Sequence, residues 1–398
     1  MAKDKNITLE ALTNALDNNE LVFFYQPIIS LVTGKPCGVE ALIRWLHADG
    51  SIISPSMFIP LAEESGIITR ITRTMLPKLL TDLKAIHQVD PTLMVALNVS
   101  TQDLTVSDFA ENVLLEIQNH QTSLNNFSIE ITESQSLVLN DRIRKVLVAL
   151  DNVGVQIVLD DFGTGYSSIS LIRDIPVIMV KIDQRFVVEV FAVEKSSQIV
   201  RHSIGLAHQL GMETIAEGVE SQAVFDFLLC FGATKAQGYY FSPPLPLTDL
   251  LSYLSKNPCY LHVPPLGLIH LAQQDHVDWR RDFVREILNI IAEQDEKTRQ
   301  QAYDRLPCLD PNECLFGKWY SKEGQRFRGT LLFEQLGFAH RELHELANRI
   351  VIATRQQTPR ERVIESIWHL QKHSYELIRL LSELHTIAAL EYKNMKPF

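Results

Sequence analysis

The chain has 398 residues, of which 46% are hydrophobic and 21% charged, and its formal net charge is −11. This length exceeds one ordinary hydrophobic core, so two or three domains are expected. The balanced composition excludes disordered and collagen-like chains. The negative charge argues against a nucleic acid as partner, because phosphate backbones bind basic surfaces.

Targeting signals and cysteines narrow the setting. The opening MAKDKNITLE contains no apolar run of the signal-peptide kind, and no later stretch approaches the roughly 18 apolar residues that indicate a transmembrane helix. We therefore expect a cytoplasmic protein with no membrane partner. Five cysteines at irregular spacing do not form a disulfide framework, so a functional cysteine is expected to be a metal ligand or a redox thiol.

Short β-rich runs alternate with helical patterns up to about residue 258, as expected for parallel strands joined by crossover helices. The expected strands are 21–28, 39–45, 93–100, 127–132, 155–160, 177–183, 213–218 and 236–241. This number of strands over such a length predicts a (β/α)8 barrel of the TIM type. Only the short turn LVTGKPC separates the first two strands, so one antiparallel strand is expected in the barrel.

A change of pattern follows the barrel. The segment KNPCYLHVPPLG (256–267) has three prolines and indicates a linker. Beyond it, residues 268–298, about 327–355 and 359–392 carry apolar positions at helical spacing, which predicts an all-α helical bundle. The expected domains are therefore 1–258 and 268–398, joined by a linker at 259–267. The whole acidic excess lies in residues 1–263, which hold 29 acidic and 18 basic residues.

Carboxylates and carboxamides stand at nearly every expected strand end, where the active face of such a barrel forms. They are Glu40, Asn98, Glu130 with Glu133, Asp160 with Asp161, Asp183 beside Lys181, Glu217 with Glu220, and Gln237. Any one of them alone is more often a helix cap or a solvated loop residue. Together, oxygen ligands on one face predict Mg²⁺ or Mn²⁺, and two such ions suit cleavage of a phosphodiester.

These motifs carry a resemblance to a known family. EALIRW (40–45), LNVS (97–100), EITE (130–133), DDFGTGYSS (160–168), VKID (180–183), AEGVE (216–220) and QGYYFSPP (237–244) resemble the EAL-domain cyclic di-GMP phosphodiesterases of bacteria. The resemblance covers roughly residues 8–258. It implies hydrolysis of one phosphodiester bond of cyclic di-GMP, which gives the linear dinucleotide pGpG.

The resemblance also implies roles for individual residues. One Mg²⁺ or Mn²⁺ would be held by Glu40, Asn98, Glu130 and Asp160, and a second by Asp160, Asp161 and Glu217. Lys181 would orient or deprotonate the attacking water, with Glu217 as the other candidate base. Glu133 would brace the loop DDFGTGYSS, which also implies a homodimer. The substrate would contact Gln26, Leu42, Arg44, Asp183 and Gln237.

A degenerate member of the same family would bind cyclic di-GMP without cutting it. Such a protein is expected to lack a metal ligand or the loop sequence, and this chain has no departure at the ligand positions, at Lys181 or in DDFGTG. The active enzyme is the favoured reading. The alternatives are a non-catalytic receptor and an interaction protein with a ligand-gated barrel.

The tail has a second group of possible metal ligands, His276, Cys314, His340 and His344. His340 and His344 are four apart on an expected helix, so both imidazoles project from one face. Three histidines and a thiolate suit a closed tetrahedral zinc site of structural or sensory type. Histidines of an ordinary core would look similar, and His369 with His373 has the same spacing.

The surrounding segments LAQQDHVDWRR, NECLFGKWY and FEQLGFAHRELHELANRIV resemble the chemoreceptor zinc-binding domain over roughly residues 268–350. The resemblance assigns zinc to His276, Cys314, His340 and His344. It leaves His369 and His373 outside the site, and Cys308 is the weaker cysteine candidate. QQAYDRLPCLD is a probable insertion between His276 and Cys314. Either zinc binding or oxidation of Cys314 could then regulate the barrel.

Overall fold

The structure is a computed structural model that describes residues 7–47, 50–120, 126–132, 141–163, 172–260, 266–293 and 295–395, with side chains described to residue 390. The chain divides into two compact units. One contains residues 1–227 and 233–261, and the other contains residues 228–232 and 262–398. Within the described part of the chain, no helix combines the length and apolarity needed to cross a membrane.

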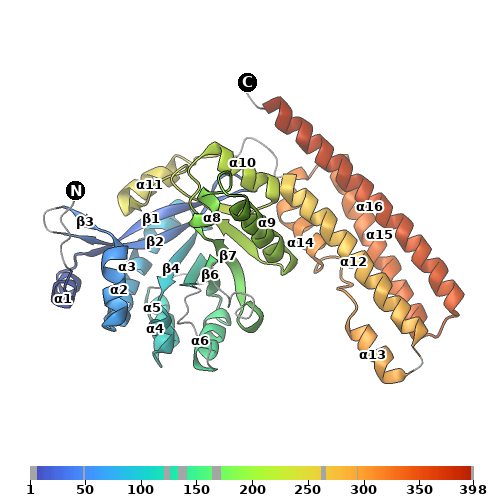
Figure 1. Ribbon diagram of the computed structural model, residues 1–398, viewed down its shortest axis with the longest axis horizontal. Coiled ribbons are helices and arrows are strands. Elements are labelled where there is room, and N and C mark those ends of the chain that lie inside the picture. Colours follow the sequence, from blue (N-terminus) through green and yellow to red (C-terminus); the bar gives the residue numbers. More distant parts are fainter. Residues whose placement is uncertain are drawn as a thin grey trace. The chain divides into compact units, whose positions relative to one another are not determined.

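The first unit contains a closed barrel of eight strands (Figure 1). The barrel strands are β1 (Leu21–Ser30), β2 (Pro36–Leu46), β4 (Met94–Val99), β5 (Phe127–Thr132), β6 (Gln156–Phe162), β7 (Val177–Ile182), β8 (Glu213–Ala216) and β9 (Lys235–Gln237). β1 is antiparallel to both its barrel neighbours, β2 and β9, and the other neighbours are parallel. The predicted TIM-type barrel with one antiparallel strand is confirmed.

Helices and two short strands surround the barrel. The helices are α1 (Leu9–Asp17), α2 (Pro55–Glu64), α3 (Ile68–Val89), α4 (Thr101–Thr105), α5 (Phe109–Asn119), α6 (Asp141–Asp151), α8 (Gln184–Val188), α9 (Glu194–Gln209), α10 (Gln222–Phe231) and α11 (Leu247–Ser255). The two-residue strands β3 (Ile52–Ile53) and β10 (Leu245–Pro246) extend the edges of the sheet. A large apolar core lies between the strands and the helices.

The alternation of strand side chains places the polar residues above an apolar layer. Ile28, Met94, Val158, Met179 and Ile215 form a separate buried cluster. Because alternate residues of a strand share a face, Asp160 follows Val158, Lys181 follows Met179 and Glu217 follows Ile215 on the barrel interior. The interior is therefore apolar below and polar at the carboxyl ends of the strands.

The expected strand at 236–241 is wrong beyond Gln237, where β9 ends. Residues after it turn back, because the backbone of Val219 pairs with Gln237 O and with the N–H of Tyr240. The same backbone leaves no room for a side chain at position 238. A Cβ on Gly238 would lie only 2.2 Å from Val219 O. The expected strand 213–218 likewise ends early, at Ala216.

The second unit is helical, as predicted. Its helices are α12 (Leu266–Ala292), α13 (Glu296–Asp304), α14 (Leu315–Ser321), α15 (Leu331–Arg355) and α16 (Arg360–Met395), with a 3₁₀ turn at Glu323–Phe327. The helix expected over 268–298 is two helices, because the Asp295 carboxylate accepts the N–H of Thr298 and starts α13. α12, α15 and α16 pack along one another around Phe283, Leu343 and Leu370 (Figure 1).

Candidate functional site

The carboxyl ends of the parallel strands bring most of the predicted metal ligands together around one lysine. Lys181, on β7, has a side chain that is only 1% exposed. Its Nζ lies 2.8 Å from Glu130 Oε2 and 2.7 Å from Glu217 Oε1. Glu40 Oε2 lies 3.3 Å away and Asp160 Oδ1 3.6 Å away. A single ammonium group thus faces four carboxylates that come from four different strands or strand ends.

Glu40 is held by two carboxamides. Asn98 Nδ2 donates to Glu40 Oε1 at 2.7 Å, and Gln237 Nε2 donates to Glu40 Oε2 at 2.7 Å. The same Gln237 nitrogen lies 2.9 Å from Gln26 Oε1, and Gln26 Nε2 donates to Ser242 O at 3.1 Å. The carboxylate of Glu40 is therefore fixed from both sides, and Gln237 and Gln26, which were predicted as substrate contacts, belong to this network.

The buried charges are not balanced by lysine alone. Burial opposes the charged form of Lys181, but Asp160, Glu130, Glu217 and Glu40 raise its pKa well above the usual value. Burial also favours the neutral form of Glu40, but Lys181, Asn98 and Gln237 hold its pKa below normal. Burial raises the pKa of Glu217 to about 8 and raises that of Glu130 strongly. Four carboxylates and one ammonium leave an acidic excess that protons or cations must relieve.

Asp160, Asp161 and Glu217 form a second grouping, in which one ligand oxygen from each lies within 4.8 Å of the others. The N–H of Asp161 donates to Asp160 Oδ1 at 2.8 Å, and Asp161 adopts a left-handed backbone conformation with φ of 57°. Burial and the neighbouring Asp160 raise the pKa of Asp161 to about 6. This unusual backbone aims two adjacent carboxylates at the same small region.

The chemistry of these groups fits divalent cations of the magnesium class. Every candidate ligand offers oxygen, which selects Mg²⁺ or Mn²⁺ over softer metals. Glu130 Oε1 is buried and receives no hydrogen bond from any described residue. Such an orphaned carboxylate oxygen is costly in a dry interior unless a cation binds it. The residues present therefore fit the predicted ions.

A cavity of about 330 Å³ adjoins these ligands and is mainly apolar. Glu40, Leu42 and Asn98 line it, together with Glu63 and side chains of α2 and α3. Leu42 was predicted to contact the substrate, and it faces this space. Arg44, predicted to bind a phosphate oxygen, donates from Nη1 to Ile43 O at 2.9 Å and is not part of the cavity wall.

Asp183 has a different surrounding from the one expected. Its buried carboxylate caps α8 by accepting the N–H of Arg185 at 2.7 Å, and the Arg185 guanidinium contacts both carboxylate oxygens at 3.0 and 3.1 Å. These bonds hold the pKa of Asp183 below normal despite burial. A substrate group would have to share Asp183 with Arg185. Glu133 and the loop residues 164–168 lie outside the described residues.

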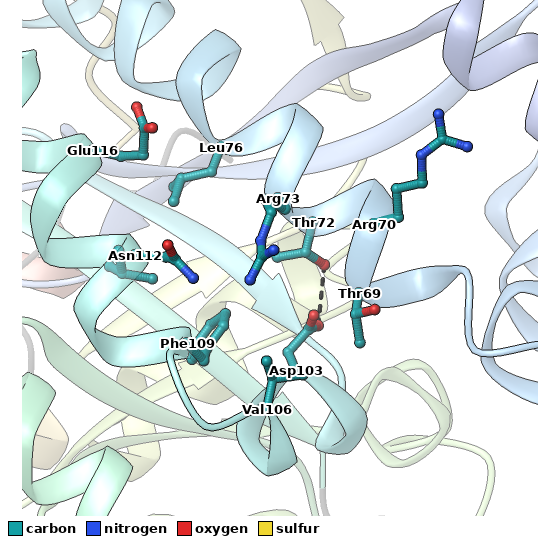
Figure 2. A pocket seen from close by; sticks show the side chains of 11 residues that line it. Thr69, Arg70, Thr72, Arg73, Leu76, Asp103, Val106, Phe109, Asn112 and Glu116 are labelled. Atoms are coloured by element: carbon teal, nitrogen blue, oxygen red, sulfur yellow. Dashed lines mark hydrogen bonds between the residues drawn. The ribbon is translucent and has the colours of Figure 1, made fainter.

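One buried acid near the site was missed from the sequence. Figure 2 shows Asp103 in a hollow of about 340 Å³ between α3, α4 and α5, where it bonds to Thr72. Asp103 Oδ2 accepts from Thr72 Oγ1 and from the N–H of Ser100, each at 3.0 Å. Ser100 and Asp103 form a capping box for α4. The pattern Ser-x-x-Asp directly after β4 was the signal, and the box supports the strand end that carries Asn98.

In the second unit, three of the four predicted zinc ligands lie together. Ligand atoms of Cys314, His340 and His344 all lie within 4.8 Å of one another, and all three residues are buried. Cys314 Sγ is 3.2 Å from His340 Nε2. His344 Nδ1 lies 2.9 Å from Leu309 O, so an Nδ1–H donor there leaves Nε2 free for a metal. This sulfur and nitrogen set fits zinc.

Burial keeps these groups uncharged and ready to act as ligands once deprotonated. It lowers the pKa of His340 to about 2, with help from the neighbouring His344. It raises the pKa of the Cys314 thiol to about 11, against the hydrogen bond from Gly317. Neutral imidazoles are the metal-binding form, whereas the thiol must lose its proton on binding.

His276 lies apart from the cluster of Cys314, His340 and His344. Its Nε2 is 2.8 Å from Ser374 Oγ, and its ring stacks on Trp279, with 6.5 Å between ring centroids. Trp279 in turn packs against His344 at 4.6 Å. Burial lowers the pKa of His276 to about 3. His276 is thus a buried neutral imidazole next to the cluster, with a hydroxyl as its present partner.

The competing residues named from the sequence lie elsewhere. His369 and His373 are both exposed on α16. Cys308 is exposed, and its Sγ contacts Asp310 O at 3.6 Å. None of the three is part of the buried group of Cys314, His340 and His344.

Residues 9–244 match the EAL domain family, and residues 276–351 match the chemoreceptor zinc-binding domain. The chain belongs to the EAL domain family. Cyclic di-GMP phosphodiesterase PdeL of Escherichia coli is 33% identical, over 62% of this chain and 68% of its own length. Cyclic di-GMP phosphodiesterase PA2567 of Pseudomonas aeruginosa is 33% identical, over 62% of this chain and 42% of its own.

Solved EAL structures agree with the barrel. The PaMucR phosphodiesterase in complex with c-di-GMP is 32% identical, with a TM-score of 0.58, over 61% of this chain and 98% of its own. The EAL enzyme Bd1971, bound to cAMP and cyclic di-GMP, is 31% identical with a TM-score of 0.60, over 62% of this chain and 67% of its own. The chain spans only 31% to 49% of the length of the first five curated relatives that it matches.

Proposed function

We propose that this EAL-family chain hydrolyses one phosphodiester bond of cyclic di-GMP and releases pGpG. The observation that carries the proposal is the arrangement of Glu40, Glu130, Asp160 and Glu217 around the buried Lys181, with Asn98 and Gln237 fixing Glu40. Relatives named cyclic di-GMP phosphodiesterases support the choice of substrate.

Two ions of Mg²⁺ or Mn²⁺ are part of this proposal. One would be held by Glu40, Asn98, Glu130 and Asp160, and the other by Asp160, Asp161 and Glu217. When bound, such ions polarise the phosphodiester, lower the pKa of water and stabilise the attacking and leaving oxygens. Their charge would also neutralise the acidic excess of the cluster, which makes the pocket suitable for a dianionic nucleotide.

The chain's own groups would orient the attacking water and take its proton. Lys181 Nζ and Glu217 Oε1 lie 2.7 Å apart at the ends of neighbouring strands, so a water at this edge can contact both. Lys181 orients the water by hydrogen bonding, and Glu217 Oε1 can accept its proton. Leu42 and the adjoining cavity offer apolar surface to a nucleotide base. Glu133 remains a predicted brace of the loop that begins at Asp160.

Product analysis tests the enzymatic proposal. Purified protein is incubated with Mn²⁺ and cyclic di-GMP, and nucleotides are separated by chromatography. Wild type should form pGpG, and Glu40→Ala should not, because it removes the carboxylate that Asn98 and Gln237 hold. If wild type binds cyclic di-GMP but leaves it intact, the chain is the alternative, a non-catalytic receptor or scaffold.

For the tail, we propose a zinc ion held by Cys314, His340, His344 and His276. Four protein ligands close the site, so its role would be regulatory or structural. His276 would have to exchange its hydrogen bond with Ser374 for the metal. The phosphodiesterase rate, measured with and without a zinc chelator while Mg²⁺ is in excess, tests regulation, and a rate changed by oxidant alone would favour thiol oxidation at Cys314. The homodimer and the cytoplasmic location remain predictions.

A further inference from the structure

A pair of exposed histidines on α16 has no role in either proposed centre. His369 and His373 both lie on the solvent side of this helix, whereas the zinc ligands proposed above are buried. They are separated by four residues within one continuous helix, Arg360–Met395. Residues four apart are neighbours on a helix surface, with Cβ atoms about 5–6 Å apart.

The local hydrogen bonding favours a metal-binding tautomer of His373. Its Nδ1 lies 3.0 Å from His369 O, and the carbonyl can only accept, so Nδ1 carries the proton. The lone pair of His373 is therefore on Nε2. Side chains of a helix lean toward its N-terminus, so the His373 ring extends over the preceding turn, where His369 stands.

The surrounding charge favours cations. His373 lines a hollow of about 510 Å³ between α15 and α16, together with three acids, Glu334, Glu342 and Glu376. Arg379 is the one basic residue in its lining, and it is paired with Glu376 at 2.7 Å. One turn before His369, Glu365 is also exposed. An acidic groove raises the local concentration of divalent cations.

We propose that His369 and His373 form a second, surface site for a borderline divalent transition-metal ion, with zinc as the ion to test. Two imidazole nitrogens would bind the ion, and water would complete its coordination. The described residues gather no third protein ligand of the pair within the distance seen in the buried cluster. The surface site is therefore open and weaker, and zinc in it exchanges readily.

This inference goes beyond the proposed function and does not depend on it. A protein with one closed and one open zinc site should bind zinc in two phases. The second phase would begin only after the buried cluster is filled. Any zinc-dependent change of rate would then need to be assigned to one phase or the other.

Zinc titration of the full chain in competition with a chromophoric chelator tests the proposal. Wild type should bind a second equivalent of Zn²⁺ about 100-fold or more weaker than the first, since two ligands replace four. The double variant His369→Gln with His373→Gln should lose the second equivalent and keep the first. In Cys314→Ser, the surface equivalent should remain with unchanged affinity, which separates this test from the fate of the buried centre.

A matched variant tests the spacing itself. Gln371→His combined with His373→Gln keeps the number of histidines on α16 but sets the pair two residues apart, on opposite sides of the helix. This variant should weaken the second equivalent about tenfold or more. The proposal is overturned if wild type shows no second equivalent, or if either variant binds it as tightly as wild type.

Discussion

Lys181 Nζ lies 2.7 Å from Glu217 Oε1, and the two residues come from the neighbouring strands β7 and β8. The same ammonium is 2.8 Å from Glu130 Oε2. Lysine therefore partly neutralises the carboxylates in the absence of other cations. The remaining acidic charge gives the barrel its affinity for divalent ions and, in our account, its activity.

Replacing Lys181 should make the barrel depend on metal for its stability. Lys181→Met leaves four carboxylates around a buried apolar group, which should cost about 3–5 kcal/mol without divalent ions. Added Mn²⁺ should raise the thermal unfolding temperature of this variant more than that of wild type, and turnover should be lost. Differential scanning fluorimetry with and without Mn²⁺ measures the effect.

Lys235→Met is a matched control, because Lys235 pairs with Glu213 at 2.9 Å away from the metal ligands. Its stability should respond to Mn²⁺ as wild type does. Equal Mn²⁺ responses in Lys181→Met and wild type would show that Lys181 does not occupy the charge centre of the site.

Asp103 should make stability decrease as pH rises through the range of its shifted pKa. Burial raises the pKa of Asp103 from 3.8 to about 6. Between these values the folded state keeps a proton that the unfolded state has released, so the free energy of unfolding falls as pH increases. Asp103→Asn does not titrate, and its Oδ1 can accept both bonds that Asp103 Oδ2 accepts.

From pH 5 to pH 7.5, Asp103→Asn should therefore gain about 1–2 kcal/mol in stability relative to wild type. Urea unfolding at both pH values measures this difference. The exposed neighbour Asp108 should show no such gain on Asp108→Asn, because its pKa is lowered, chiefly by a hydrogen bond from Asn112. A constant difference between Asp103→Asn and wild type would mean that Asp103 is ionised throughout.

Cys314, and not Cys308, should determine zinc content. Cys314 Sγ lies 3.2 Å from His340 Nε2, whereas Cys308 is exposed and contacts only the nearby Asp310 O among the bonds described for it. Elemental analysis after dialysis should give about one zinc per chain for wild type and Cys308→Ser, and much less for Cys314→Ser. Loss of zinc in Cys308→Ser alone would reverse the assignment.

His276 should act as a ligand despite its present bond to Ser374. His276→Gln should weaken zinc binding at the buried site by about tenfold or more, as loss of a ligand does. Ser374→Ala removes only the hydroxyl 2.8 Å from His276 Nε2, and it should leave zinc affinity equal or higher. Chelator competition measures both. If His276→Gln binds zinc like wild type, the buried site has three protein ligands.

Much of the fold could be predicted because strand alternation and strand-end acids are local patterns. The short turn between the first two strands was enough to predict the antiparallel β1. The end of β9 was not predictable, because it depends on Val219, eighteen residues before Gln237, approaching Gly238. The break between α12 and α13 depends on the Asp295 cap, which competes with continued helical periodicity.

The candidate ligands could also be named from the sequence, but their partners could not. Nothing in the pattern indicated that Lys181 would lie among four carboxylates, because that depends on four strands closing around one point. Arg185 covers Asp183 through a local helix cap that sequence leaves open to other choices. Ser374 meets His276 across 98 residues of chain, a pairing that only the packed helices reveal.

The most direct test of the account is one reaction of wild-type protein with cyclic di-GMP and Mn²⁺ in water enriched in ¹⁸O, followed by mass spectrometry of the product. Hydrolysis by water predicts pGpG that carries one ¹⁸O atom in its terminal phosphate. Cyclic di-GMP that stays intact under conditions in which it binds would contradict the central claim, as would a linear product without the label.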